Sequence, residues 1–239
     1  MDMLESHFDR KTRRALDSLI PLIEQRIKNC KVIGLGSGRT VAYLLGKLSE
    51  ELDLSQLTFV PSSRQILLVA KRIGLKMTSY DTITSVDLTI DGADEVDSEP
   101  KVIKGGGGGL IGERSLSYLS SKYVIVVDES KLSSRLGFKS HLPMEVNVHA
   151  LPMVLRYLDR KGLKYSLKVD ERGFPKLSQS GNYLVELLLS NITIDRSFIS
   201  SLRNFPGVVD VGVFFREEIT EVLIGGFDGS VKILSGDKI

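Results

Sequence analysis

Cysteine is nearly absent from the sequence, which holds Cys30 and no other cysteine among its 239 residues. A single cysteine excludes a disulfide within the chain and a zinc site built from several cysteines. Long apolar runs are missing too, since no stretch approaches the roughly 18 apolar residues of a membrane-spanning helix. The first residues include Asp2 and Glu5 and lack the apolar core of a secretory signal. We therefore expect a soluble, cytoplasmic protein with no membrane partner.

A strong excess of one charge is also lacking. The formal net charge is +2, which is too small to indicate a nucleic-acid partner. The one dense basic segment, residues 11–14, falls in an expected helix, where a solvated face is the simpler interpretation. Hydrophobic residues make up 42% of the chain and charged residues 26%, as in ordinary globular proteins. The length accommodates one large α/β domain, or a medium domain with a smaller partner.

Strands and helices are expected to alternate over the first half of the chain. Apolar residues recur at helical spacing from about residue 4 to residue 28, and Pro21 divides this stretch into two expected helices. Apolar runs predict strands at 31–35, 57–60, 75–78, 86–90 and 123–127, with helices at 41–48 and 64–73 and another after the glycine run. Near-continuous apolar strands between helices are typical of a parallel sheet covered on both faces. We predict a Rossmann-like, doubly wound α/β fold.

The pattern changes after about residue 139. The expected elements are strands at 144–148, 165–169, 183–189 and 208–215, with helices at 151–160 and 196–204. This β-α-β-β-α-β order is that of a ferredoxin-like α+β unit. Residues 222–226 and 231–234 are expected to form one or two further strands that return to the first sheet. We therefore predict a catalytic domain of residues 1–138 with 217–239, and a smaller ferredoxin-like domain of residues 139–216.

Carboxylates and a lysine surround a run of glycines in the middle of the chain. The segment Asp91-Gly92-Ala93-Asp94 directly follows an expected strand, and Lys104 precedes five glycines, Gly105 to Gly109, and then Glu113. Catalytic groups gather at the carboxyl ends of parallel strands. Glycine suits a backbone that must approach a ligand and offer it N–H groups. The combination predicts an acid–base site for a small polyol or its phosphate.

Each part of this pattern also has a simpler interpretation. Asp-Gly-x-Asp is most often only a turn. The glycine run alone resembles a linker, but apolar residues flank it on both sides, which favours ordered structure. The three aspartates Asp91, Asp94 and Asp97 suggest calcium, but the later Gly and terminal Glu of an EF-hand loop are absent.

A second glycine segment predicts a phosphate site. Residues 31–40 read as a strand, a glycine turn and the start of a helix, and a helix N-terminus attracts phosphate. The third glycine of the dinucleotide fingerprint is replaced by Arg39, and the Lys-Ser/Thr of a Walker loop is missing. Ser37, Arg39 and Thr40 offer two hydroxyls and a guanidinium to a phosphate monoester. An N-cap serine with a solvent-facing arginine is the alternative, and both remain open.

These motifs resemble those of the type A ribose-5-phosphate isomerase family. The resemblance is carried by Gly34-Leu-Gly-Ser-Gly-Arg-Thr, Asp91-Gly-Ala-Asp-Glu, Lys104-Gly-Gly-Gly, Glu113, Ser130-Lys131, Pro206-Gly-Val and Leu223-Ile-Gly, in order over nearly the whole chain. It implies interconversion of D-ribose 5-phosphate and D-ribulose 5-phosphate in the non-oxidative pentose phosphate pathway. It also implies no metal or organic cofactor, a sugar phosphate as the small-molecule partner, and a homodimer or homotetramer.

The resemblance also implies roles for individual residues. Glu113 would be the general base that carries a proton between C1 and C2 through an enediolate. The other catalytic residues would be Asp91, Asp94 and Lys104, with the ring-opening role undivided between the two aspartates. The substrate-binding residues would be Ser37, Gly38, Arg39, Thr40, Asp91, Gly92, Ala93, Asp94, Lys104, Gly105, Gly106, Gly107 and Lys131.

Some residues depart from the family pattern. Arg39 stands where many members have a small hydroxyl residue, so its contact with phosphate is left open. Gly108 and Gly109 replace two alanines, and Gly112 replaces a larger residue. An N-terminal lysine near the phosphate has only Lys11 as a candidate counterpart.

Three other functions remain as alternatives. An amino-sugar phosphate deaminase usually employs a histidine, but His7, His141 and His149 lie outside the strand-end motifs. A coenzyme A transferase would use a glutamate such as Glu113 as a nucleophile. A non-catalytic sugar-phosphate sensor would bind without turnover. A sensor need not retain a catalytic base, whereas Glu113 is present here.

Overall fold

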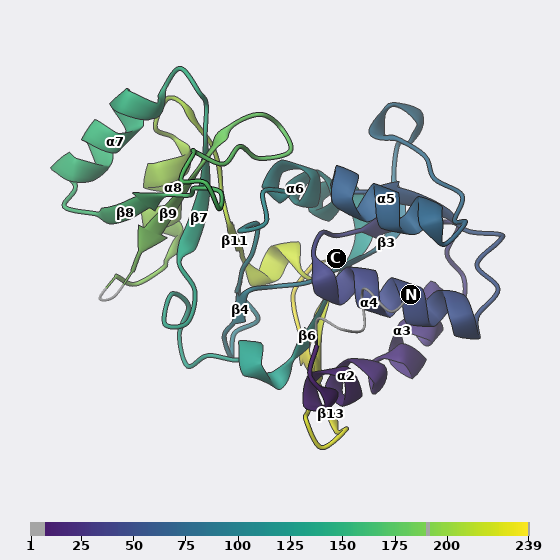
Figure 1. Ribbon diagram of the computed structural model, residues 1–239. Helices are drawn as coiled ribbons and strands as arrows, with labels where there is room; N and C mark the ends of the chain where they lie inside the picture. Colours follow the sequence, from purple (N-terminus) through teal and green to yellow (C-terminus); the bar gives the residue numbers. More distant parts are fainter. Residues whose placement is uncertain (1–7, 190–191, 239) are drawn as a thin grey trace.

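Six strands form the central sheet of the computed structural model, which describes residues 8–189 and 192–238 (Figure 1). Their order is β13-β12-β6-β3-β1-β2, and every neighbouring pair is parallel except β12 and β13. The strands are β1 (Val32–Leu35), β2 (Thr58–Pro61), β3 (Val86–Asp91), β6 (Ser120–Asp128), β12 (Glu221–Gly225) and β13 (Val231–Ser235). The order reverses between β1 and β3, so their carboxyl ends form the switch point at which open α/β sheets bind ligands.

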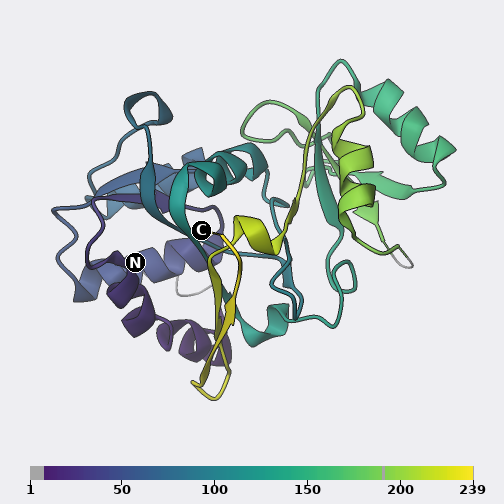
Figure 2. The ribbon, with the colours of Figure 1, turned by 180° about the vertical axis from the view of Figure 1, so that it is seen from behind.

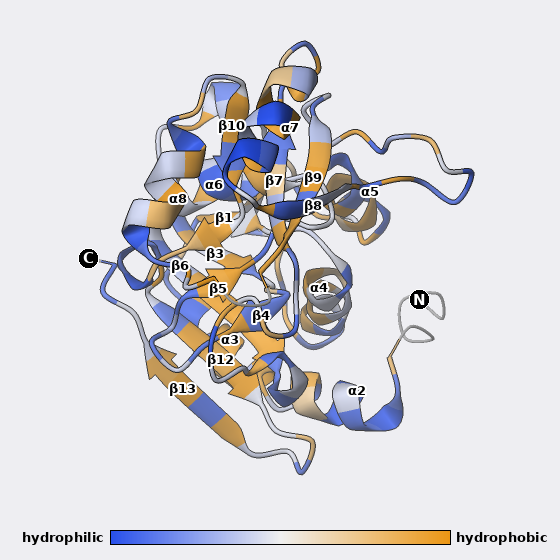
Figure 3. Cartoon of the chain, turned by 90° about the vertical axis from the view of Figure 1, so that its left-hand side faces the viewer, coloured by the Kyte–Doolittle hydropathy of each residue, from blue (hydrophilic) through white to orange (hydrophobic). Residues whose placement is uncertain are grey.

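The central sheet is buried on both faces, as the apolar runs predict. Alternate residues of β6 divide between two clusters, with Val124 and Val126 on one face and Tyr123, Ile125 and Val127 on the other. Helices α2 (Arg10–Asp17), α3 (Ile20–Ile27), α4 (Arg39–Glu51) and α5 (Arg64–Arg72) contribute to the cluster on the first face. Helix α6 (Leu110–Leu119) packs against β3 and β6 from the second face. Figure 3 shows the apolar strands at the centre of the molecule. The predicted doubly wound sheet is confirmed.

The N-terminal helical stretch is divided, as expected from Pro21. Helix α2 (Arg10–Asp17) begins after Asp9, whose carboxylate accepts a hydrogen bond from Thr12 N at 2.7 Å. Helix α3 (Ile20–Ile27) has Pro21 in its first turn, where the missing N–H costs nothing. The start of the predicted stretch, Leu4, and also His7 lie outside the described residues. No helix within those residues is long and apolar enough to cross a membrane.

A second, antiparallel sheet forms the small unit that lies apart from the central sheet in Figures 1 and 2. It contains β7 (Leu142–Val146), α7 (Leu151–Arg160), β8 (Lys164–Leu167), β9 (Tyr183–Leu188), α8 (Arg196–Arg203) and β10 (Val208–Val211). The strand order β10-β7-β9-β8 places the fourth strand beside the first and the third beside the second. This topology and a separate apolar core confirm the ferredoxin-like unit. The exact domain boundaries at 138/139 and 216/217 stay a prediction.

A third sheet, of three short strands, corrects the prediction of one strand over 208–215. The chain leaves β10 at Gly212 and enters β11 (Val213–Phe214), which pairs with β5 (Val102–Ile103) rather than with β7. A Cβ at position 212 would lie 2.2 Å from the carbonyl oxygen of Lys104, so only glycine fits where the chain changes sheets. The partners β4 (Glu95–Val96) and β5 were not expected, because strands of two residues have no readable periodicity.

The strand predicted at 75–78 is also wrong. Within the described residues, this segment forms only an isolated parallel bridge between Phe59 and Met77, with two backbone hydrogen bonds of 2.8 Å to Phe59. It lies along the outer edge of β2, where one strand neighbour is missing. The chain then turns into the 3₁₀ segment η1 (Tyr80–Thr82) before β3 begins.

Candidate active site

A cleft of about 390 Å³ opens at the carboxyl ends of β1, β3 and β6, at the switch point of the central sheet. The residues that line it come from the segments after β1, β3, β5 and β6, from the first turns of α5 and α6, and from the N-terminal region. They are Phe8, Thr12, Ser37, Gly38, Arg39, Thr40, Gln65, Gly92, Ala93, Asp94, Lys104, Gly105, Gly107, Glu113, Asp128, Ser130 and Lys131. The structure therefore brings together most of the predicted site residues, which are spread over nearly a hundred positions of the sequence.

A buried ion-pair group forms the floor of the cleft. The ammonium Nζ of Lys104 lies 2.8 Å from Asp91 Oδ2 and 2.5 Å from Glu113 Oε2. Only 2% of Lys104, 4% of Glu113 and none of Asp91 is exposed to solvent. Lys104 comes from the loop after β5, Asp91 from the end of β3 and Glu113 from the first turn of α6. One ammonium thus separates two carboxylates that would otherwise repel each other.

Burial gives Glu113 a pKa suited to proton transfer near neutrality. Burial raises the pKa of Glu113 to about 7, and the negative charges of Asp91 and Asp94 act in the same direction, while Lys104 opposes them. Burial by itself lowers the pKa of Lys104, but the attraction of the Asp91 and Glu113 carboxylates outweighs it and the pKa is raised overall. The site therefore holds a lysine that stays charged beside a glutamate able to take or give a proton.

Asp91 lies behind Lys104 rather than in the lining of the cleft. Its Oδ2 accepts a hydrogen bond of 2.6 Å from Tyr123 Oη, and its Oδ1 accepts one of 2.7 Å from Gly92 N. With the ion pair to Lys104, the carboxylate is fully engaged by the protein. Direct contact between Asp91 and a substrate stays a prediction, and what the geometry shows is a carboxylate that holds Lys104 in place.

Asp94 differs from Asp91 in its surroundings. It is exposed and lines the cleft. A Cβ at position 106 would lie 3.2 Å from Asp94 Oδ2, so this carboxylate borders the glycine loop. Gly106 itself is the one glycine of 105–107 that does not line the cleft. Of the two aspartates that the sequence leaves equivalent, Asp94 is the one available to a ligand.

The glycine turn after β1 has the geometry of an anion site. Gly38 adopts φ +102° as the N-cap of α4, and no side chain caps this helix end. The first backbone N–H groups of α4 therefore point to the cleft without intrahelical partners. The hydroxyl of Ser37 is hydrogen-bonded to that of Ser62 at 2.8 Å. Arg39 lines the cleft and lies over the Phe8 ring at 5.7 Å, so its side chain is at the rim.

Five lining residues were not among the predicted site residues. Asp128 and Ser130 belong to the polar segment that follows β6, and their place at a strand end was the available signal. Gln65 lies in the first turn of α5, one strand away, and Phe8 and Thr12 reach the cleft from the N-terminal region. No local pattern marks these three, because only the folded chain brings them to the rim. Among the described histidines, His141 and His149 are not in the lining.

The parallel sheet, the switch-point cleft and the buried ion-pair group together define an α/β enzyme with an acid–base site for a small anionic ligand. Residues 58–229 match the family model of ribose 5-phosphate isomerase A (phosphoriboisomerase A). The chain is 33% identical over 214 residues to ribose-5-phosphate isomerase A of Trichodesmium erythraeum, covering 88% of this chain and 90% of the relative. The chain belongs to the ribose 5-phosphate isomerase A family, and so to the aldose–ketose isomerases.

Solved structures agree with this assignment. A D-ribose-5-phosphate isomerase in complex with phospho-erythronic acid superimposes with a TM-score of 0.87 at 29% identity, covering 94% of this chain and 99% of that one. The ribose 5-phosphate isomerase A of Methanocaldococcus jannaschii superimposes with a TM-score of 0.79 at 31% identity, covering 92% and 98%. The resemblance inferred from the motifs is therefore confirmed.

Proposed function

We propose that this protein interconverts D-ribose 5-phosphate and D-ribulose 5-phosphate, with Glu113 as the general base. The observation that carries the proposal is the Glu113 carboxylate, with a pKa raised to about 7, 2.5 Å from the Lys104 ammonium and facing a cleft with an anion site at its rim. Family membership, and the phosphorylated sugar acid named for a related structure, supply the substrate class.

The reaction needs one base that reaches two neighbouring carbons on the same face of the sugar. Glu113 would take the proton from C2 of the open-chain aldose and return it to C1, passing through an enediolate. Negative charge then develops on the carbonyl oxygen. Lys104, already held by Asp91, and the N–H groups of the glycine loop would stabilise that charge. Because these groups are fixed before the reaction, little reorganisation is needed in the transition state.

The phosphate would lie at the other side of the cleft. The free N–H groups of α4, the hydroxyls of Ser37 and Thr40, and the Lys131 ammonium are suited to a phosphate monoester. Holding the phosphate there would position the reacting carbons at Glu113. Ring opening needs a separate proton exchange, which we assign to Asp94 because Asp91 is buried and engaged by the protein.

The decisive experiment follows the conversion of ribose 5-phosphate to ribulose 5-phosphate with a chelator present. We expect turnover in the parent protein and a loss on the order of 10²–10⁴-fold in Glu113→Gln, as for removal of a positioned base. Glu129→Gln is the matched control, since Glu129 is exposed in η2 (Glu129–Lys131) and does not line the cleft. Near-normal turnover by Glu113→Gln would exclude this mechanism.

Two further measurements on the same protein separate the other functions. Binding without turnover, seen as a rise in melting temperature with ribose 5-phosphate, would indicate a sensor, and a covalent acyl adduct on Glu113 would indicate a coenzyme A transferase. A cytoplasmic homodimer or homotetramer acting in the pentose phosphate pathway is part of the proposal, and light scattering of the purified protein tests its assembly.

A further inference from the structure

The first turn of the helix that carries Glu113 has no side-chain cap. Helix α6 follows the five glycines 105–109, and its N-cap, Gly109, provides no side-chain hydrogen bond. Glycine leaves the backbone a wide choice of conformations, so the loop by itself restricts the start of the helix less than other residues would. Glu113 lies in the first turn of this helix. Contacts along the helix hold it in place instead, since Leu110 is fully buried and Tyr80 Oη donates to the carbonyl oxygen of Gly112 at 3.0 Å.

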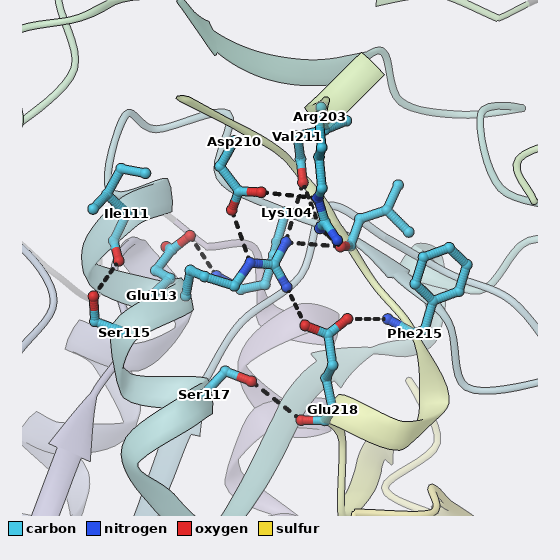
Figure 4. Close-up of polar contacts among 12 residues, drawn as sticks. Lys104, Ile111, Glu113, Ser115, Ser117, Arg203, Asp210, Val211, Phe215 and Glu218 are labelled. Carbon is cyan, nitrogen blue, oxygen red and sulfur yellow. Dashed lines mark hydrogen bonds and ion pairs between the residues drawn. The ribbon is translucent and has the colours of Figure 1, made fainter. Parts of the chain in front are cut away.

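The next residue, Arg114, supplies such a contact. Its Nε donates to Asp210 Oδ2 at 2.8 Å, and its Nη2 donates to the carbonyl oxygens of Val213 at 2.8 Å and Val211 at 3.1 Å. Its Nη1 forms an ion pair with Glu218. The guanidinium carbon also lies 3.6 Å from the centre of the Phe214 ring. Figure 4 shows Asp210, Val211 and Glu218 gathered around one guanidinium group.

The partners of Arg114 are themselves held by the small unit. Arg203 of α8 pairs with the other oxygen of Asp210 at 3.0 Å, and it donates to the carbonyl oxygen of Val213 at 2.9 Å. The second oxygen of Glu218 accepts a hydrogen bond of 2.9 Å from Phe215 N, at the start of η3 (Arg216–Glu218). Residues 210–218, which lead the chain from the small unit back to the central sheet and are called the return segment below, are therefore held in place by contacts with both α6 and α8.

The geometry of a helix turns this contact into control of Glu113. Successive residues of an α-helix lie about 100° apart around its axis, so fixing Arg114 fixes the direction of Glu113. The Phe214 ring under Arg114 also lies 5.1 Å from Lys104 Nζ and stacks on Tyr123 at 5.9 Å. Tyr123 in turn donates to Asp91. The Arg114 contact is thus linked through Phe214 to Lys104, and through Phe214 and Tyr123 to Asp91.

We propose that Arg114 is a positioning residue, which clamps α6 to the return segment 210–218 and thereby holds the Glu113 carboxylate against Lys104. Through this clamp, the placement of the small unit determines the placement of the base. The effect on rate rests on the proposed function, whereas the effect on the Glu113 carboxylate does not.

The first test compares Arg114→Met, which keeps the length but loses the charge, with Arg114→Lys and Arg196→Met. Arg196 is the matched control, since it pairs with Glu217 and lies over Phe215 at 4.6 Å but is 62% exposed in its side chain. We expect kcat of Arg114→Met to fall by about tenfold to a hundredfold, as for a displaced reacting group, with KM changed by less than about threefold. Arg114→Lys should be intermediate, because lysine keeps the charge but not the planar fork. Arg196→Met should match the parent.

The second test reads the Glu113 carboxylate directly, by NMR titration of ¹³C-labelled glutamate with Glu113→Gln for assignment. The charged and titratable groups that face Glu113 are Lys104, Asp91, Asp94, Tyr80 and Tyr123. Of these, Lys104 alone lowers the pKa of Glu113. Loss of the clamp should therefore move the midpoint to higher pH in Arg114→Met, and the acid limb of kcat/KM with it. Arg196→Met should not shift either.

Each outcome decides the proposal. An unchanged midpoint and kcat in Arg114→Met, with only a lower melting temperature, would show a purely structural role and overturn it. If Arg114→Met does not fold, the NMR titration of Glu113 is made on Asp210→Asn and Arg114→Lys instead. If the parent does not isomerise ribose 5-phosphate, the proposed function fails, and the NMR midpoint still decides whether Arg114 positions Glu113.

Discussion

Gly36 lies so close to Asp91 that a Cβ at position 36 would be 1.9 Å from the Asp91 Oδ1 atom. The backbone of the glycine turn after β1 therefore passes directly over the carboxylate that holds Lys104. The two motifs, which are separated by more than fifty residues in the sequence, form one packed unit.

Gly36→Ala should consequently damage the site. The new methyl group must displace Asp91 and loosen its hold on Lys104, so we expect kcat/KM to fall by at least about tenfold and stability to fall by about 1–3 kcal/mol. Gly46→Ala is the control, because a Cβ there meets no atom within 4 Å and α4 gains about 0.5–1 kcal/mol from the loss of glycine. Steady-state kinetics and urea unfolding measure both. Equal behaviour of the two variants would contradict the packing argument.

The pH dependence of the reaction should follow Glu113. The base is active when deprotonated, so kcat/KM should rise as pH increases through about 7 and then level off. A profile that is flat between pH 5 and 9, on the order of two units to either side of the Glu113 pKa, would show that another group limits the rate.

The stability of the folded protein should also depend on Glu113, but its contribution should fall as pH rises, whereas activity should increase. The folded-state pKa of Glu113 is raised from its ordinary value of 4.5 to about 7, so the folded state binds the proton more tightly than the unfolded chain. Its contribution is fully present below pH 4.5 and is lost as pH rises through about 7. We expect the free energy of unfolding of Glu113→Gln to vary less with pH in this window than that of the parent. Parallel curves would count against the raised pKa.

Lys131 should affect binding rather than chemistry. It lines the cleft in η2, beyond the carboxyl end of β6. Lys131→Ala should raise KM for ribose 5-phosphate by about tenfold, the scale of one charge-assisted phosphate contact, with kcat changed little. Lys122→Ala, near the amino end of the same strand, should leave both constants unchanged. An unchanged KM in Lys131→Ala would remove Lys131 from the phosphate site.

Ser37 and Gly109 should be energetically coupled. A Cβ at position 109 would lie 2.5 Å from Ser37 Oγ and 3.5 Å from Glu113 Oε1, although the backbone φ of −94° suits any residue. Gly109→Ala should push the Ser37 hydroxyl from its bond with Ser62 and lower kcat/KM, and much less so once Ser37→Ala has removed that hydroxyl. A coupling energy of about 0.5–3 kcal/mol is expected for contacting residues. The control is Gly107→Ala, whose Cβ meets no atom within 4 Å and should combine additively with Ser37→Ala. Additive effects of Gly109→Ala and Ser37→Ala would mean that the turn and the loop adjust independently.

The central sheet was predictable because its strands carry a strong local signal. Runs such as residues 123–127 are apolar throughout, and such runs between helices indicate a parallel sheet with two covered faces. The segment 75–78 alternates apolar and polar residues and lies at an edge, where tertiary context left a single bridge. Residues 208–215 were predicted as one strand because their apolar pattern continues across Gly212, whereas the change of sheet depends on Lys104, more than a hundred residues away.

The amino-acid sequence by itself determined the family and the order of its motifs, and it predicted Glu113, Lys104 and the two aspartates as catalytic residues, because motifs depend on residue types at short spacing. The tertiary structure decided which aspartate faces the cleft, which distant residues complete its rim and how α6 is held by Arg114. Burial, ion pairing and helix direction are set by atoms from separate parts of the chain, so no local pattern contains them.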